Sequence, residues 1–268
     1  MDSKKSTESL KQQAESFFTS AYPESFLFSH GIEHHRRVWN YAQEIVEAGY
    51  INLSVDDYFI SNLLVACYFH DIGMAENQGK NHGTASRKKC MEFLKAHKLN
   101  PDDYQEALDA IEFHDDKTYR ASKTSNQTLA ILSVADDLDA FGFIGIYRYA
   151  DIYLRRNINK TDIGKMVLEN AAGRFQNFIR NKKSDNAFFE KHTKRYDILN
   201  QFFLCYNEEI KCTNTELSGY GGVIEIINSL INCSGKPDFQ KIFSKRPDDC
   251  VIKWFSEGIL KEIENNLT

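Results

Sequence analysis

Apolar residues recur at intervals of three and four along most of this chain, and this spacing constrains its fold more than any other feature. The spacing matches one face of an α-helix, whereas no stretch sustains the alternation expected of a β-strand. Only four prolines occur in 268 residues, so few positions would interrupt a helix. The sequence therefore predicts an all-α protein whose core draws on 19 Phe and 13 Tyr.

Capping residues mark the ends of several predicted helices. One helix should run from about residue 32 to a glycine cap at Gly49, and a more apolar one from Asp56 to Gly73. Asn126 is a good cap for a third helix, because its side chain can accept a backbone hydrogen bond. In the last third, helical patches alternate with polar loops, and we expect Gly219–Gly222 to lie in one of these loops.

Composition narrows the classes of function. The net charge is -5 and no long basic run occurs, so we expect no nucleic-acid partner. The six cysteines include no C-x-x-C pair, which argues against a disulfide framework or a cysteine zinc site. The polar N-terminus and the absence of a run of about 20 apolar residues predict a cytoplasmic protein without a membrane partner.

A histidine and an aspartate stand together where the second of these helices should end, in the string "YFHDIG" at residues 68–73. Neighbouring helical residues point about 100° apart, so His70 and Asp71 can reach one cation only beside the helix end. The unsatisfied carbonyl groups at that end favour a cation. The alternative is that His70 is a hydrogen-bonded core histidine and Asp71 a cap.

Other histidines fall on apolar helix faces. His114 continues the stripe of Ala107 and Ile111, so its side chain should face inward. His34 and His35 each continue an acceptable stripe, and periodicity does not choose between them. His82 opens a helix, where backbone N–H groups can help to hold an anion. His30, His97 and His192 are assigned no role.

Three acidic residues, Asp136, Asp137 and Asp139, lie in the apolar segment "SVADDLDAFG". A buried carboxylate is costly unless it is paired or binds a metal, and the spacing again admits either Asp136 or Asp137 as the inward one. Together, imidazoles and carboxylates at several helix ends suit divalent Mn, Fe, Ni, Co or Mg better than a closed tetrahedral zinc site. One or two ions would leave places for water or substrate.

The order of these motifs resembles the HD-domain superfamily of metal-dependent phosphohydrolases, in particular its small bacterial branch. The motifs are His34-x-x-Arg37-Val38, His70-Asp71, His82, His114, Ala135-Asp136-Asp137-Leu138 and a glycine-rich run from Gly142 to Arg148. The resemblance implies an HD-domain helical bundle with additional C-terminal helices. We expect an N-terminal helical segment at 1–29, the HD metal-binding domain at 30–160, and a helical extension packed on it at 161–268.

The resemblance also implies roles for individual residues. It selects His34 over His35 and Asp136 over Asp137. The implied metal ligands are His34, His70, Asp71, Asp136, His82 and His114. Members with two ions use the last two histidines for the second ion, with Asp71 bridging, whereas members with one ion use them to hold or protonate the substrate. His82, His114 and Asp71 are accordingly the expected catalytic residues.

The expected function is hydrolysis of a phosphate mono- or diester, in a nucleotide or another small phosphorylated metabolite, by metal-activated water. Arg37, Lys80 and Arg148 are candidates to bind the phosphate. The same superfamily includes di-iron oxygenases, and this alternative stays open, as does a non-catalytic, metal-binding regulatory module. The C-terminal third is expected to shape the pocket or a homodimer interface.

Overall fold

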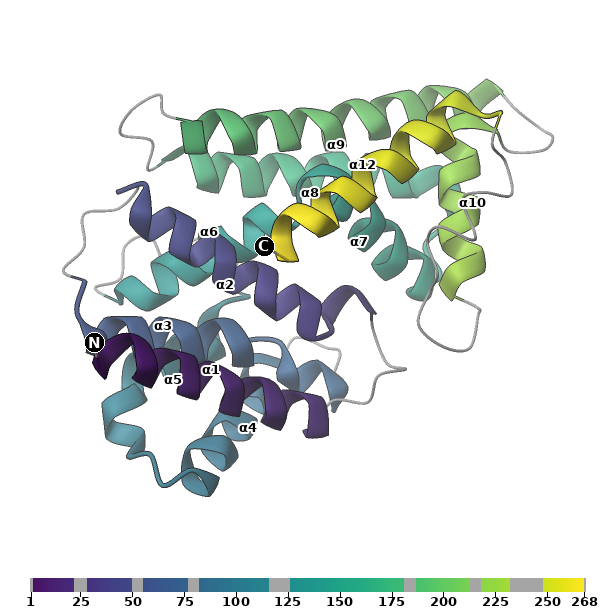
Figure 1. Ribbon diagram of the computed structural model, residues 1–268. Helices are drawn as coiled ribbons and strands as arrows, with labels where there is room; N and C mark the ends of the chain where they lie inside the picture. Colours follow the sequence, from purple (N-terminus) through teal and green to yellow (C-terminus); the bar gives the residue numbers. More distant parts are fainter. Residues whose placement is uncertain are drawn as a thin grey trace. The chain divides into compact units, whose positions relative to one another are not determined.

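The computed structural model describes residues 2–21, 28–49, 55–76, 82–115, 126–180, 187–212, 218–231 and 248–267. Over these ranges the chain forms eleven α-helices and three short 3-10 helices, and no strand (Figure 1). The predicted all-α fold is confirmed. The chain divides into two compact units, Met1–Asp136 and Asp137–Thr268; the boundaries at 29/30 and 160/161 stay predictions.

The first unit is built around α3. Its elements are α1 (Asp2–Ala21), η1 (Phe28–His30), α2 (Ile32–Glu47), α3 (Asp57–Phe69), η2 (Ile72–Ala75), α4 (His82–Ala96), η3 (Pro101–Tyr104), α5 (Gln105–Phe113) and α6 (Gln127–Asp139), whose last three residues belong to the second unit. Helix α3 packs against α1, α2, α4 and α5. It is apolar on nearly every side, and residues such as Leu63, Leu64 and Val65 are completely buried, because a helix without a polar face must be enclosed.

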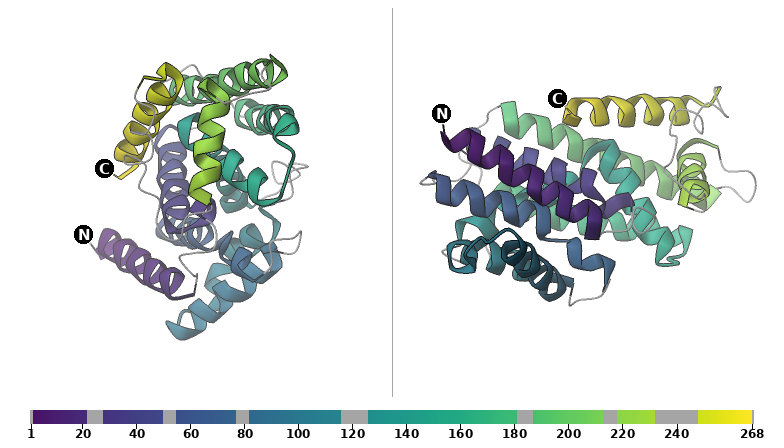
Figure 2. Two further views of the ribbon diagram at one scale, coloured as in Figure 1. Left: turned by 90° about the vertical axis from the view of Figure 1, so that its right-hand side faces the viewer. Right: turned by 60° about the horizontal axis from the view of Figure 1, so that its bottom comes forward.

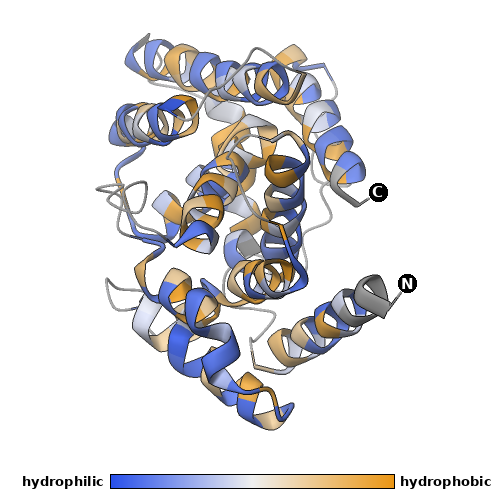
Figure 3. Ribbon diagram, turned by 90° about the vertical axis from the view of Figure 1, so that its left-hand side faces the viewer, coloured by the Kyte–Doolittle hydropathy of each residue, from blue (hydrophilic) through white to orange (hydrophobic). Residues whose placement is uncertain are grey.

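Helix α1 is amphipathic, and Figure 3 shows apolar residues recurring between polar ones along its coloured part. Leu10, Ala14 and Phe18 form its buried face. On another side, Glu15 accepts hydrogen bonds from Arg36 of α2, at 2.7 Å to Nη2, and from the hydroxyl of Tyr68 of α3, also at 2.7 Å. These bonds join α1 to α2, which carries His34, and to α3, which ends just before His70.

Three predicted caps are confirmed. Gly49 follows α2 with a φ of +61°, a left-handed conformation that suits glycine. The Asp56 carboxylate accepts the backbone N–H of Phe59 at 2.8 Å, and the Asn126 side chain accepts that of Leu129 at 2.8 Å. Local chemistry therefore determines where α3 and α6 begin.

The predicted end of α3 at Gly73 is wrong, because α3 ends at Phe69 and Gly73 lies inside η2. The glycine is needed there for close packing. A Cβ atom on Gly73 would lie 2.4 Å from the backbone nitrogen of Ser86 and 2.5 Å from the carbonyl oxygen of His82. Glycine therefore lets α4 approach the turn that follows α3.

The second unit is built around α7. Its helices are α7 (Gly142–Arg155), α8 (Lys160–Arg180), α9 (Ala187–Cys212), α10 (Gly219–Ile231) and α12 (Cys250–Leu267). Helix α7 packs against α8, α9, α10 and α12, and α8 lies along α9 in both views of Figure 2. Within the described ranges, no helix combines the length and apolar character needed to span a bilayer.

The loop predicted at Gly219–Gly222 is also wrong, because α10 begins at Gly219. Acidic side chains from elsewhere in this unit cap the helix. Asp249 accepts the backbone N–H of Gly219 at 2.7 Å, and Glu209 accepts that of Tyr220 at 2.8 Å. These caps are distant in sequence, so local turn preferences did not reveal them.

Candidate metal centre

Helix ends of the first unit bring six histidines and aspartates together. They are His34 at the start of α2, His70 and Asp71 after α3, His82 at the start of α4, His114 after α5 and Asp136 near the end of α6. All six are buried. They form two triads, His34–His70–Asp136 and Asp71–His82–His114, and the potential ligand atoms within each triad lie within 4.8 Å of one another.

A bend in the chain lets the neighbours His70 and Asp71 both reach the centre. His70 keeps helical geometry, with φ -57° and ψ -39°. Asp71 leaves the helix, with φ -109° and ψ 4°. The end of α3 thus overcomes the 100° separation that adjacent residues would have in a continuous helix.

In the first triad, the Nε2 atoms of His34 and His70 lie 3.1 Å apart, and His34 Nε2 lies 3.8 Å from Asp136 Oδ1. In the second triad, the Nε2 atoms of His82 and His114 lie 3.2 Å apart. Two ligands about 2.1 Å from one ion and at a right angle to each other would be about 3.0 Å apart. Both imidazole pairs are therefore spaced to share an ion.

Asp71 connects the two triads through its two carboxylate oxygens. Oδ1 lies 3.0 Å from His114 Nε2 and 3.4 Å from His82 Nε2. Oδ2 lies 3.6 Å from His70 Nε2 and 3.7 Å from His34 Nε2. One oxygen thus faces each triad, the arrangement that a bridging carboxylate requires.

Backbone carbonyls orient two of the imidazoles. His70 Nδ1 lies 3.0 Å from the Cys67 carbonyl oxygen, and His114 Nδ1 lies 2.7 Å from that of Ile111. A carbonyl can only accept, so each Nδ1 donates and each ring turns its Nε2 toward the centre. His114 Nε2 lies 3.0 Å from Asp71 Oδ1, a distance at which a proton or a cation can be shared between them.

Burial and charge favour the protonation states that bind metal. Burial lowers the pKa of His70 to about 3, so its imidazole is neutral. Burial raises the pKa of Asp71, but the charge of His70 when that ring is protonated, and hydrogen bonds from the imidazoles of His114, His34 and His82, hold this pKa well below its usual range. A neutral imidazole beside an ionised carboxylate is the donor set that a divalent ion needs. The residues present therefore fit one or two metal ions.

Periodicity left open which of His34 and His35, and which of Asp136 and Asp137, faces inward; all four are buried, and they differ in their partners. His35 is buried, but its Nδ1 bonds to the Cys67 carbonyl at 3.0 Å and its Nε2 has no hydrogen-bond partner. Asp137 accepts hydrogen bonds in the second unit from Arg174 at 2.9 Å and Asn177 at 2.7 Å. His34 and Asp136, not their neighbours, belong to a triad.

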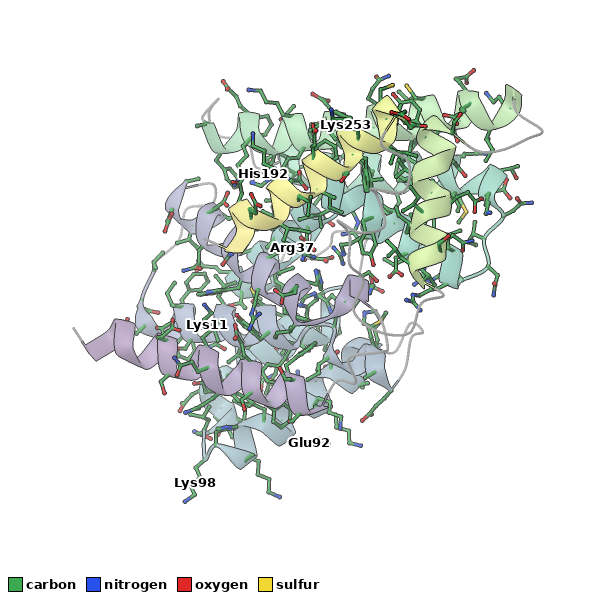
Figure 4. The ribbon with its side chains drawn as sticks, turned by 45° about the vertical axis from the view of Figure 1, so that its right-hand side comes forward. Lys11, Arg37, Glu92, Lys98, His192 and Lys253 are labelled. Carbon is green, nitrogen blue, oxygen red and sulfur yellow. The ribbon has the colours of Figure 1, made fainter. Side chains whose placement is uncertain are left out.

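The predicted phosphate-binding residues have different positions. Arg37 lies on α2, one turn after His34, and is half-buried (Figure 4). Arg148 is buried in the second unit, where its Nη1 lies 2.9 Å from Asp139 Oδ2. Lys80 lies outside the described residues. The charge of Arg148 is thus already balanced by an aspartate.

His30 was assigned no role from the sequence, yet it lies beside this centre. Its Nε2 is 3.7 Å from Asp71 Oδ2, and its ring centroid is 5.7 Å from that of His34. Helical spacing gave no signal for it, because η1 ends at His30 and α2 begins at Ile32, so His30 and His34 do not share one helix. The other two unassigned histidines lie elsewhere: His97 after α4, bonded to the Phe93 carbonyl, and His192 on α9 beside Arg195 (Figure 4).

Comparisons with known proteins agree with this fold. A protein-family model described as HD-CE matches residues 15–196. The crystal structure of a Lactobacillus plantarum protein, a structural-genomics target, matches with a TM-score of 0.58 and 15% identity, over 77% of this chain and 99% of that one. At this identity the similarity concerns the fold alone. No curated protein matches the sequence significantly.

The matched region contains every residue of the two triads, together with the helices that carry them. It spans more than half of the 268 residues. The chain therefore belongs to the HD-CE family, which is related to the HD domain.

Proposed function

We propose that the protein is a metal-dependent phosphohydrolase that acts on a nucleotide or another small phosphorylated metabolite, as a phosphomonoesterase or phosphodiesterase. One observation carries the proposal: the Asp71 carboxylate presents one oxygen to each of two buried histidine-containing triads. A mixed nitrogen and oxygen donor set suits Mn, Fe, Ni, Co or Mg. Two ions sharing a carboxylate are typical of enzymes that cleave phosphate esters.

The residues divide into those that hold ions and those that act on the substrate. His34, His70 and Asp136 would hold the first ion, with Asp71 shared. A divalent ion bound there supplies Lewis acidity and lowers the pKa of a coordinated water toward 7. With two ions, His82 and His114 complete the second site; with one, they are placed to hold the substrate or to protonate its leaving oxygen.

Cationic residues would help by balancing charge on the phosphoryl group as it is transferred. Arg37 is the better placed of the described candidates, since it follows His34 by one turn of α2. Arg148 is engaged with Asp139 at 2.9 Å, so its role would be to orient that aspartate unless the pair separates. Lys80 remains a candidate from its place in the sequence.

The six-residue donor set would equally serve two irons, so a di-iron oxygenase is the second candidate. The favouring observation is the same pair of triads, each with two imidazole nitrogens. Hydrolysis and oxygenation differ in what they consume. Only an oxygenase takes up O₂, whereas a hydrolase transfers one oxygen of water to the released phosphate.

The deciding experiment loads the purified protein separately with each of the five divalent ions and supplies nucleotides, cyclic nucleotides and sugar phosphates. We expect metal-dependent hydrolysis of at least one substrate in ¹⁸O-labelled water, with one ¹⁸O entering the phosphoryl product and no O₂ uptake. Two bound irons together with substrate-dependent O₂ uptake would favour the oxygenase. Metal binding without turnover across the whole panel would favour a regulatory module.

Two neighbouring histidines provide a matched test of the site. His34→Ala should lower activity by about 100-fold or more and should lose the ion of the first triad, because it removes a ligand. His35→Ala should retain most of both, since its Nδ1 bonds to the Cys67 carbonyl and it belongs to neither triad. Metal analysis of the two proteins checks this order, and the reverse order would mean that His35 is the ligand.

A further inference from the structure

The 3-10 helix η1 ends with a histidine that has no place in the proposed metal ligation. His30 is 8% exposed, and its Nε2 lies 3.7 Å from Asp71 Oδ2. Ser29, which is 1% exposed, places its hydroxyl oxygen 3.0 Å from His30 Nδ1. The ring is therefore held at both edges, by a hydroxyl on one side and a carboxylate on the other.

His30 belongs to neither triad, although it lies next to both Asp71 and His34. Its 3.7 Å separation from Asp71 Oδ2 exceeds hydrogen-bond length, so the interaction is electrostatic. The negative carboxylate favours the tautomer with the proton on Nε2, and the Ser29 hydroxyl can then donate to Nδ1. A ring with its proton on Nε2 donates a hydrogen bond and does not ligate an ion through that atom.

The side chains of the centre differ in exposure. His34 and His70 have no exposed side-chain surface, whereas Asp71 and Asp136 keep 8%, His82 9% and His30 10%. We call the partly exposed groups the rim of the centre. A substrate that reaches the ions from solvent would contact this rim, which includes His30.

We propose that His30 is a substrate-binding residue that donates a hydrogen bond from Nε2 to a phosphoryl oxygen of the substrate, with Ser29 orienting the ring. This inference rests on the proposed phosphohydrolase function and adds a binding residue to it. A phosphate held by the ions would present its remaining oxygens toward the rim. A hydrogen bond from an imidazole to such a charged oxygen is strong and directional.

The test measures metal content and the binding of inorganic phosphate to the manganese-loaded full chain. His30→Leu removes the donor and should weaken phosphate binding about tenfold, while the number of ions per chain is unchanged. His30→Gln, whose amide nitrogen can replace Nε2, should recover part of the affinity. Ser29→Ala should weaken binding about threefold, because the ring loses its orientation but keeps its donor.

His97→Leu is the matched control, because His97 is half-buried after α4 and its Nδ1 bonds to the Phe93 carbonyl. It should leave both metal content and phosphate affinity unchanged. Circular dichroism melts of every variant establish that the protein is folded. If His30→Leu fails to fold, Ser29→Ala and His30→Gln carry the test.

Several results would overturn the inference. Loss of an ion in His30→Leu would make His30 a ligand, and unchanged phosphate affinity in His30→Leu and Ser29→Ala would remove its role. An equal loss of phosphate affinity in His97→Leu would show that removing any histidine weakens binding, so the loss in His30→Leu would not be specific to His30. If the unmodified protein takes up metal but neither binds phosphate nor hydrolyses phosphate esters, the proposed function is wrong as well. If it binds phosphate and hydrolyses esters, and the His30 variants bind phosphate equally well, only the inference about His30 is wrong.

Discussion

At the scale of single residues, the Cys67 carbonyl oxygen orients two histidines with different environments. It lies 3.0 Å from Nδ1 of both His35 and His70. Both rings must therefore donate from Nδ1 and present bare Nε2 atoms. The Nε2 of His70 faces His34 and the first triad, whereas that of His35 is buried without a hydrogen-bond partner. The same local bond thus yields a candidate ligand in one case and a neutral core residue in the other.

The buried His35 should make the stability of the metal-free protein depend on pH. Burial lowers its pKa well below the ordinary value, so below about pH 6.5 the unfolded chain binds a proton that the folded chain does not. The contribution of His35 to the free energy of unfolding is therefore fully present above about pH 6.5 and is lost as the pH falls below it. When the pH is lowered from 7.5 to 5.5, the free energy of unfolding of His35→Leu should fall by about 1.4 kcal/mol less than that of the unmodified protein. Urea unfolding at the two pH values measures this difference, and an equal fall in both proteins would contradict it.

At the scale of helices, glycines bring the carriers of the second triad together. A Cβ atom on Gly83, next to His82 at the start of α4, would lie 2.4 Å from the carbonyl oxygen of Glu112 on α5. The two backbones therefore touch at a point close to both His82 and His114. This contact explains how two separate helix ends can place their Nε2 atoms 3.2 Å apart. Helical periodicity predicts each helix but not this approach.

Gly83→Ala should separate α4 from α5, because backbone atoms cannot move aside as a flexible side chain can. We expect a loss of about 1–3 kcal/mol in the free energy of unfolding and weaker metal binding at the second triad. Gly173→Ala on α8 is the matched control, since nothing lies within 4 Å of its added Cβ, and it should stabilise by up to about 1 kcal/mol. Urea unfolding gives the free energy of unfolding of the two variants, and metal titration gives their metal affinity. Equal values for Gly83→Ala and Gly173→Ala would contradict the explanation.

At the scale of the whole molecule, both triads lie within the first compact unit, Met1–Asp136. Asp136 is the last residue of that unit, and the next residue on α6, Asp137, takes its partners Arg174 and Asn177 from the second unit. Metal binding should therefore stabilise the first unit directly. The two units are joined along α6 itself, immediately after a candidate ligand.

Manganese at 100 times its dissociation constant should stabilise the folded protein by about 2.7 kcal/mol, because the unfolded chain lacks the site. Asp71→Ala should abolish this gain while leaving the helical circular dichroism signal mostly intact, since Asp71 contacts both triads. Asp109→Ala is the control, because Asp109 pairs with Arg87 outside the triads, and its manganese response should persist. Calorimetry with and without manganese checks both, and a full response in Asp71→Ala would exclude the proposed centre.

Local chemistry let the sequence alone determine the all-α fold and the caps at Gly49, Asp56 and Asn126. The order of the motifs, through the family that they resemble, singled out the six residues that lie in the two triads, His34 and Asp136 among them. These features can be read from the sequence because helix periodicity and capping act over a few residues.

The tertiary structure decided what depends on groups distant in sequence. Periodicity did not separate His34 from His35, because neighbouring residues can each continue an apolar stripe; the Nε2 atom of His70, facing His34, makes the distinction. The close approach of α4 to Gly73, and the place of His30 at 3.7 Å from Asp71, are likewise contacts between segments that are separate in sequence. Such contacts arise only when separate helices pack, so no local pattern encodes them.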